Sequence, residues 1–534
     1  MPTTKINQPR ESEGLDLSDR LEKSELGGVQ ETTKHDSSKE TEGLRKAADA
    51  IPSAAWLVML LTMAERFSFY GMTAPFMNFM QNNRDDVLRP GALGWGQARA
   101  SQVSNAFYVM ALLTPIASGL VADKRLGRYK VLCITFSIYL TGSALLLLSS
   151  IPALASHSAG LFITALVFIA VGMSGANGLL AAFVGDQYTT EDGTVVTTRG
   201  GERIVVDRAR TIESIYNAYY WCINVGGLSG LATTALELHV GFWAAFLLPL
   251  CALSLSAAVL ILGRGRMTIS PAQPSAIPNA LRAMWLAVCA GFSLDKARPA
   301  HQQVEHARKV AWTDVFVDEL QTALEACRIL FATWPVLWLC RGQINNNLVS
   351  QAAQMDTAGV PNDMMYNANP IIIILFMPVV DKFLFPWLRR SGYSLTAVTR
   401  LTWGFALEAL AMAMAAVVQK LIYISPPCYE SPCAAPHQTA APVFVQVPIY
   451  VLEALSEILS SPAGYELAFS MAPGSMKSVM QSVFSATGAV AAGLSIAISP
   501  MYKDPDMVWV YASLAVLMGA VTTVFYLVWA RKLG

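Results

Sequence analysis

Charged residues are scarce in this chain. Asp, Glu, Lys and Arg make up 14% of its 534 residues, whereas a soluble domain averages about 25%. The 38 basic and 38 acidic residues leave a net charge of zero, which gives no reason to expect nucleic acid as a partner. Because 54% of the residues are hydrophobic and the mean hydropathy is +0.41, most of the chain is expected to lie in a lipid bilayer.

The sequence also lacks the short motifs of common catalytic and nucleotide-binding sites. It contains no Walker loop, no Gly-x-Ser-x-Gly and no His-Glu-x-x-His. Six of the eight cysteines lie in or next to apolar segments without metal-ligand spacing, and we expect them to pack as small hydrophobic residues: Cys133, Cys222, Cys251, Cys289, Cys327 and Cys340. We therefore predict neither an enzyme nor ATP-driven transport, and no metal or cofactor.

The remaining two cysteines, Cys428 and Cys433, share a short polar loop that is rich in proline. The orientation derived below places this loop outside the cell, where the compartment is oxidising. A disulfide and two free thiols both stay open as interpretations.

Apolar residues gather into twelve segments of membrane-spanning length. Their approximate ranges are 52–76, 99–121, 130–150, 160–184, 211–235, 241–262, 329–349, 368–388, 397–421, 443–466, 478–500 and 507–529. The sequence therefore predicts an all-α membrane protein with twelve transmembrane helices. We expect two six-helix bundles around a central cavity, which rock to alternate its access.

Polar segments divide the chain into four parts. Residues 1–50 are rich in Glu, Lys, Ser, Thr and Asp, which predicts a disordered cytosolic tail. The N-terminal bundle is expected at 51–262, a cytosolic linker loop at 263–326 and the C-terminal bundle at 327–534. The apolar middle of the linker is either an amphipathic surface helix or a linker packed on the bundle, and we favour the second interpretation.

Basic residues alternate between successive loops. Lys and Arg gather in the loops after segments 2, 4, 6 and 8 and at the end of the chain, whereas 151–159, 236–240 and 351–369 contain none. The positive-inside rule then places both termini in the cytosol. The first external loop departs from the pattern, because it carries Arg84 and Arg89.

A Glu-Arg pair lies inside the first apolar segment. Glu65 and Arg66 are flanked on both sides by apolar residues, and the whole segment, 52–76, is long enough to span a membrane. Charges at such a depth are costly, and they are usually paired and functional. The pair indicates a membrane transporter or channel.

The turn between segments 2 and 3 reads Gly-Leu-Val-Ala-Asp-Lys-Arg-Leu-Gly-Arg-Tyr-Lys over 119–130. Its glycines permit a tight turn, and Asp123 is suited either to cap a helix or to pair with Arg128. The turn resembles the signature motif of the major facilitator superfamily. The resemblance implies the twelve-helix fold of that superfamily.

Further motifs resemble the proton-dependent oligopeptide transporters. Glu65–Gly71 is similar to that family's first-helix Glu-x-x-Glu-Arg-Phe-x-Tyr-Tyr-Gly, and Gly342–Ala352 is similar to the fungal members' Gly-Gln-x-x-Asn-Asn-x-x-Ser-Gln-Ala. The other matching segments are 186–188, 220–226, 361–363, 456–457 and 472–478. The resemblance runs from about 52 to 530 and covers all twelve predicted helices.

Three positions depart from the family pattern. Thr62 stands where the first motif begins with Glu, Asn177 replaces the fourth-helix Lys, and Arg341 replaces the Tyr before Gly-Gln. In the family, the first-helix carboxylates and that Lys take part in proton coupling and in binding the peptide carboxylate, and the tenth-helix Glu contacts the peptide amine. Of that set, Glu65, Arg66 and Glu457 remain. We expect Arg341 to replace the lost cation and to face Glu457 or Glu453. The alternative is that Arg341 snorkels to an interface.

The proton-coupling candidates are Glu65, Glu457 and Glu453. No histidine lies in a predicted membrane core, and a buried carboxyl is suited to exchange protons near neutral pH. Glu65 has a second interpretation, a static ion pair with Arg66. We interpret Glu408 as structural.

The predicted substrate-binding residues combine charges with amide side chains, which hydrogen-bond peptide groups without fixing the side chain of the peptide. They are Arg66, Tyr70, Asn177, Asn224, Trp334, Arg341, Gln343, Asn346 and Glu457. Hydrogen bonding between helices is the alternative role for the polar members. Phe67, Phe69, Phe107 and Tyr108 are interpreted as packing residues.

The resemblance implies a monomeric, proton-coupled symporter that imports di- and tripeptides across the plasma membrane. Its partners are the peptide, protons and the lipid bilayer. The losses at Thr62 and Asn177 favour an alternative, a relative retuned to a peptide-derived metabolite and working as importer or exporter. A non-transporting peptide sensor and a uniporter without proton coupling also stay open.

Overall fold

The computed structural model describes residues 46–86, 90–122, 126–191, 193–197, 203–269, 277–291, 293–306, 309–392, 396–427, 429, 438–470 and 477–530. These residues form two compact units. One contains the described residues up to Pro52 together with those of Tyr188–Asn217, and the other contains the described residues of Ser53–Gln187 and those from Ala218 onward. Cys428 and Cys433, Asp123 and the tail up to residue 45 lie outside the described residues.

The smaller unit is built around a three-stranded sheet. Its strands are β1 (Lys46–Ala47), β2 (Val195–Thr197) and β3 (Arg203–Val206), in the order β1-β3-β2. β1 is parallel to β3, and β2 is antiparallel to it. Lys46 and Ala47 belong to the segment predicted to be disordered. They pair with Val205 and Val206 of β3, 159 positions further along the chain, so the end of that segment is ordered here.

The larger unit consists of helices. Those of the first half are α2 (Ser53–Thr73), α3 (Phe76–Gln81), α4 (Gly96–Val121), α5 (Arg128–Ser150), α6 (Ser158–Asp186), the end of α7 (Arg208–Gly227), α8 (Ser229–His239) and α9 (Phe242–Leu262). The linker contributes α10 (Ile277–Cys289) and α11 (Pro299–His306). Those of the second half are α12 (Asp314–Arg341), α13 (Asn347–Ala353), α14 (Ala368–Val379), α15 (Phe385–Arg390), α16 (Ala397–Ile424), α17 (Val447–Ser470), α18 (Lys477–Ile498) and α19 (Met507–Phe525).

Helices lie at each of the twelve predicted segments, which is consistent with the predicted count. Several segments are divided in two, most clearly the seventh, where α12 ends at Arg341 and α13 begins at Asn347. Within the described part of the chain, six helical segments are long and apolar enough to cross a membrane on their own. They are 128–150, 152–186, 242–266, 397–424, 443–464 and 507–528.

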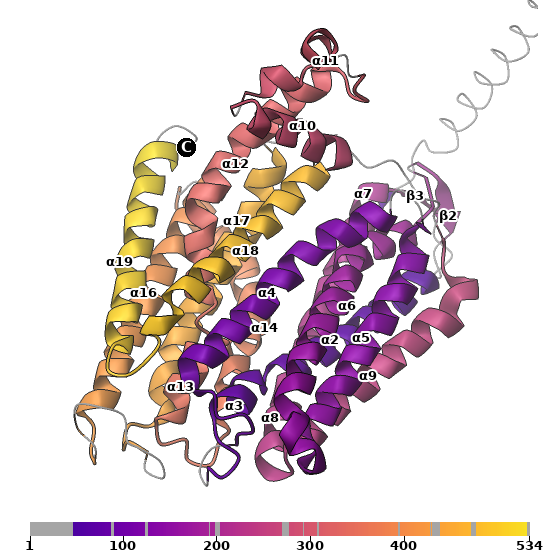
Figure 1. The fold of residues 1–534 in the computed structure, drawn as a ribbon. Helices are drawn as coiled ribbons and strands as arrows, with labels where there is room; N and C mark the ends of the chain where they lie inside the picture. Colours follow the sequence, from indigo (N-terminus) through magenta and orange to yellow (C-terminus); the bar gives the residue numbers. More distant parts are fainter. Residues whose placement is uncertain are drawn as a thin grey trace, which may run out of the picture. The chain divides into compact units, whose positions relative to one another are not determined.

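Close helix packing in the first half depends on small residues. α5 packs along α6 and α2 along α9 (Figure 1). A Cβ atom at Gly172 of α6 would lie 2.5 Å from the backbone nitrogen of Tyr139 in α5, so only glycine permits this approach. Near the start of α6, the Phe162 ring stacks on Phe79 of α3 with centroids 4.9 Å apart. These contacts fix the helices that form one wall of the cavity described below.

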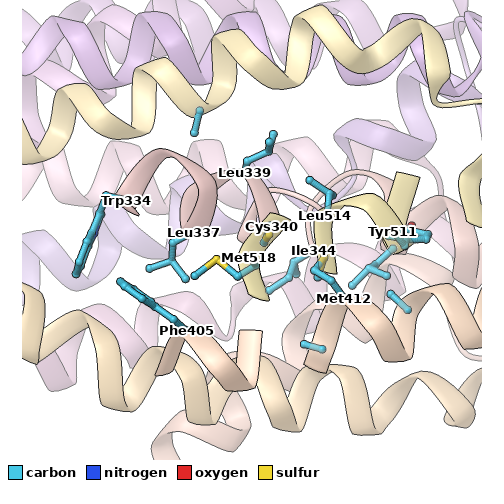
Figure 2. Packing of buried hydrophobic residues seen from close by; sticks show 14 of the residues in the cluster. Trp334, Leu337, Leu339, Cys340, Ile344, Phe405, Met412, Tyr511, Leu514 and Met518 are labelled. Atoms are coloured by element: carbon cyan, nitrogen blue, oxygen red, sulfur yellow. The ribbon is translucent and has the colours of Figure 1, made fainter. Parts of the chain in front are cut away.

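The second half has a continuous hydrophobic core that includes α12, α16 and α19. Figure 2 shows Trp334 beside Phe405, with Leu337 and Met518 next to them. The Trp334 ring meets Phe405 edge-on at a centroid distance of 5.6 Å and is 1% exposed. Trp334 therefore anchors α12 to the core.

The linker combines both interpretations of its middle segment. Ala280 and Ala283 of α10 are buried in the core of the second half, whereas Leu281 and Trp285 on the same helix are 43% and 68% exposed. The segment is thus an amphipathic helix, and it is also packed on the bundle. Further along the linker, the indole of Trp312 donates a hydrogen bond to the carbonyl of Ala297.

Candidate functional site

A cavity of about 600 Å³ lies between the two halves of the helical unit. Its walls come from α2, α4, α6 and α7 in the first half, and from α12, α14, α17 and α18 in the second. The polar and charged residues that line it are Arg66, Asn105, Ser174, Asn177, Asn224, Arg341, Asn345, Asn346, Asn369, Glu453, Glu457 and Ser495, together with the tyrosines Tyr70, Tyr108 and Tyr366. The volume is within the range of about 300–1,000 Å³ that is typical of small-molecule sites.

Arg66 is held at the cavity wall by Glu65. Its Nε and Nη2 donate to the two carboxylate oxygens at 2.7 and 3.1 Å, which makes the pair bidentate. Glu65 is fully buried and is not part of the cavity lining, whereas Arg66 is. The guanidinium also lies 5.4 Å from the centroid of Phe69 and interacts electrostatically with Tyr70.

The family motif over 220–226 lies in α7, and its Gly226 allows α7 to pack closely against Glu65 and Arg66. A Cβ atom at Gly226 would lie 2.7 Å from the carbonyl oxygen of Met63 and 2.8 Å from Cβ of Arg66. Only glycine permits that approach. The first-helix and fifth-helix motifs are therefore parts of one packed contact at the cavity wall.

Arg341 is bound by α16 and α17. Its Nη2 donates to the hydroxyl of Ser460 at 2.7 Å and its Nη1 to that of Ser461 at 3.1 Å, while its Nε lies 3.8 Å from Oε2 of Glu408. The carboxylate that forms an ion pair with Arg341 is Glu408, and Arg341 also interacts electrostatically with Glu453, one of the two expected partners. The adjacent Ser460 and Ser461 of α17 supply the hydroxyls that bind the guanidinium.

Two carboxyl groups, those of Glu408 and Glu453, interact electrostatically with Arg341, with each other and with Glu457. Glu408 and Glu453 are fully buried, and no described group donates a hydrogen bond to their carboxylate oxygens. One guanidinium cannot neutralise two buried carboxylates that also face Glu457, so this cluster is suited to bind protons.

The departures from the family motifs remove charge from the same cavity. The hydroxyl of Thr62 donates to the carbonyl of Val58 at 2.8 Å and is fully buried, so no acid replaces the missing Glu. Asn177 lines the cavity as a neutral amide. The cations on the cavity wall are then Arg66 and Arg341.

The structure divides the predicted substrate-binding residues into two groups. The cavity lining contains Arg66, Tyr70, Asn177, Asn224, Arg341, Asn346 and Glu457. It does not contain Trp334, which packs in the core, or Gln343, whose side chain donates to the carbonyl of Leu339 and accepts from Asn347. Gln343 is occupied because it closes the turn between α12 and α13.

Several cavity residues were not among the predicted ones. Asn105 and Asn369 are polar residues inside apolar segments, a signal that was present in the sequence. Tyr108, interpreted as a packing residue, lines the cavity together with Asn345 of the opposite half. No sequence signal identifies Tyr366, which lies in the turn before α14.

Arg128, at the start of α5, forms an ion pair with Asp186 at the end of α6. The adjacent Gln187 accepts from the backbone N–H of Thr268 and donates to the carbonyl of Phe183. This ion pair therefore joins the signature turn over 119–130 to the matching segment over 186–188. The expected partner of Arg128, Asp123, lies outside the described residues.

These motifs are matched by a protein-family model. The model of the POT family (PTR2) covers residues 129–519 of this chain. The chain belongs to the POT family. The resemblance found in the sequence motifs is thereby confirmed.

Similar proteins include fungal transporters. Peptide transporter PTR_A of Candidozyma auris is 37% identical over 95% of this chain and 87% of its own length. Peptide transporter PTR2 of Saccharomyces cerevisiae is 35% identical over 90% of this chain and 79% of its own length. Among solved structures, the POT family transporter PepTSo has a TM-score of 0.71 at 22% identity, covering 91% of this chain and 99% of that one. The predicted fold class, the major facilitator fold, is confirmed.

Proposed function

We propose that this chain is a proton-coupled symporter that imports di- and tripeptides. The observation that carries the proposal is the arrangement of charge on the cavity walls. Arg66 lies on the first half, and Glu453 and Glu457 lie on the second. A zwitterionic peptide has a carboxylate for the cation and an ammonium for the acids, and the amides on the walls suit its backbone groups.

The excess of carboxyls around Arg341 supports proton coupling. Glu408 and Glu453 share one cation in a buried site beside Glu457, and a peptide ammonium that arrives there changes how many protons the cluster holds. Glu65 has both carboxylate oxygens engaged by Arg66, so we assign it to holding that cation. We assign the exchange of protons to Glu453 and Glu457.

The remaining parts of the proposal concern the setting of the protein. We place it in the plasma membrane as a monomer with both termini in the cytosol, driven by the proton gradient without a cofactor. The distribution of Lys and Arg among the loops supports this orientation. We also propose the bundles at 51–262 and 327–534, joined by the cytosolic linker at 263–326.

Reconstituted liposomes test the proposal. The full chain is placed in vesicles that contain a pH-sensitive dye, and dialanine is added outside together with an inward proton gradient. We expect the dipeptide to accelerate acidification of the lumen, and a protonophore to abolish accumulation of the peptide. Blocking the amine or the carboxylate of the dipeptide should each weaken transport by tenfold or more, because a hydrogen bond to a charged group contributes about 1.5–3 kcal/mol.

The other outcomes identify the alternatives. Dipeptide uptake without proton movement indicates a uniporter. Dipeptide binding without uptake indicates a sensor. The absence of both binding and uptake indicates a member retuned to another metabolite, an interpretation that the neutral Asn177 favours.

A further inference from the structure

Two buried carboxyl groups from opposite halves of the helical unit meet away from the cavity. Glu237 lies near the end of α8 and is 3% exposed, and Asp363 lies in a short 3-10 turn, Asn362–Asn367, and is 1% exposed. Both side chains line one small cavity, and the charge of Asp363 acts directly on Glu237. A carboxylate oxygen only accepts, so two carboxyls form a hydrogen bond only when one of them carries a proton.

Two asparagines complete this contact between the halves. The amide of Asn78 in α3 donates to Oε1 of Glu237 and to Oδ1 of Asn362, both at 2.9 Å. Asn362 donates back to Oδ1 of Asn78 at 2.9 Å. Oε2 of Glu237 and both oxygens of Asp363 receive no hydrogen bond from any other described group. A proton is therefore the missing donor.

No cation compensates the pair within the described residues. The helices packed around it, α3, α9, α13 and α14, contain no Lys, Arg, His, Asp or Glu. α2 carries only Glu65 and Arg66, which bind each other. On the elements of the pair themselves, the other titratable groups are His239, which is exposed at the end of α8, and Tyr366, which lines the central cavity.

A small cavity connects the pair to the surface. It measures about 270 Å³ and is lined by residues that include Glu237, Ala353, Asp356 and Asp363, and no Lys, Arg or His is among them. Asp356 is exposed, so water reaches this cavity. Glu237 accepts from the amide of Asn78, and the third acid of the cavity, Asp356, is exposed. Two buried carboxyls supply fewer oxygens than the six or more that Ca²⁺ takes, so they favour a proton over this cation.

We propose that Glu237 and Asp363 bind one proton between them, and that this shared proton joins the two halves at the end of the helical unit opposite the start of α2. When the halves meet, one proton from water adds to one carboxylate, and the second carboxylate accepts its hydrogen bond. When the halves part, both carboxyls become hydrated and the proton returns to water. The site is separate from the central cavity and needs no substrate.

The electrostatics agree with this assignment. Burial raises the pKa of both groups, and the neighbouring Asp363 raises the pKa of Glu237 further. A carboxyl whose pKa is raised in the joined state stabilises that state at low pH, and this stabilisation is lost as the pH rises through the raised pKa. Acid should therefore hold the halves together at this end, and alkali should let them part.

Site-specific labelling of the purified full chain in detergent tests the proposal without any substrate, so its outcome is independent of the proposed peptide transport. Ala353, which lines the small cavity and is 2% exposed, is replaced by cysteine. The rate at which a thiol reagent modifies this cysteine is followed by mass spectrometry. We expect the rate to rise between about pH 5.5 and 7.5, approaching tenfold per pH unit, as release of one proton requires.

The matched variants distinguish the pH dependence that comes from the Glu237–Asp363 pair from the intrinsic pH dependence of thiol reactivity. E237Q supplies an amide donor to Asp363, so the halves should stay joined without a proton, and the extra pH dependence should disappear. D356N changes an exposed carboxyl in the same cavity and should keep the native profile. The thermal midpoint of the native chain should fall over the same pH range, while that of E237Q stays constant.

Two results would overturn the proposal. The first is an equal pH dependence in the native chain and in E237Q, in both labelling and thermal midpoint. The second is that millimolar Ca²⁺ or Mg²⁺ suppresses labelling at the higher pH, because this would identify a cation site in place of a proton site.

Discussion

Arg341 of α12 and Glu408 of α16 form a buried ion pair in the second half of the helical unit. The Nε of Arg341 lies 3.8 Å from Oε2 of Glu408, and their side chains are 8% and 0% exposed. The two remaining nitrogens of the guanidinium donate to Ser460 and Ser461. The cation is therefore fixed to three helices before any substrate arrives.

This pair should behave as a coupled unit. Removing one member leaves the other charge buried and unpaired, which typically costs about 3–5 kcal/mol. We expect R341Q and E408Q each to lower the thermal midpoint of the detergent-purified protein, and the double variant R341Q/E408Q to lower it by less than the sum. An exposed cation on α10 provides the control, because R282Q should leave the midpoint unchanged. Additive effects would contradict the pairing.

Arg66 should require its planar guanidinium. Lysine keeps the charge but cannot form two parallel hydrogen bonds with Glu65, so its ammonium would be held less firmly at the cavity wall. We expect R66K to raise the KM for dialanine uptake about tenfold, which corresponds to about 1.4 kcal/mol. R99K changes an exposed arginine on α4 and should leave KM unchanged. An unaltered KM in R66K would remove Arg66 from the binding site.

Substitutions at Glu453 and Glu457 should distinguish a role in proton coupling from a role in peptide binding. E453Q and E457Q keep hydrogen-bonding capacity but hold no exchangeable proton. If these groups couple the proton to the peptide, each variant should retain exchange of dialanine across vesicles without a gradient and should lose proton-driven accumulation. Loss of both activities would instead assign the residue to peptide binding.

Trp334 should act through stability. Because Trp334 packs against Phe405 and Phe484 and is not itself part of the cavity lining, W334A should destabilise the protein by about 3–5 kcal/mol. The KM for dialanine should not change in the protein that remains folded. A raised KM at an unchanged thermal midpoint would return Trp334 to the substrate site.

The helical architecture could be predicted from the sequence, because local composition identifies the apolar segments of membrane-spanning length and the polar loops between them. The cavity residues Tyr70, Asn177 and Asn224 could also be predicted, because they belong to motifs whose spacing fixes the helix face. The partner of Arg341 could not. Glu453, Glu457 and Glu408 are equal candidates by residue type, and only the packing of α16 against α17 selects among them.

Trp334 and Gln343 show a second limit. A residue in an apolar helix faces the cavity, a neighbouring helix or the lipid, and the periodicity of an entirely apolar stretch does not distinguish these directions. Trp334 faces the core, where its ring closes on the space left by Gly464. Gln343 lies where α12 stops, and a helix break of five residues cannot be located from propensity alone.

The break from Gly342 to Asn346 divides the seventh segment into two helices, α12 and α13, that bind different parts of the helical unit. Arg341 on one side is tied to Ser460 and Ser461, while Asn347 and Ser350 on the other side accept from Gln97 and donate to Gln81 of the first half. A swivel at the break would release α13 from Gln97 and Gln81 and leave Arg341 in place. The break thus makes the seventh segment a hinge, across which the contacts of α13 with the first half can change while Arg341 at the end of α12 stays bound to α17.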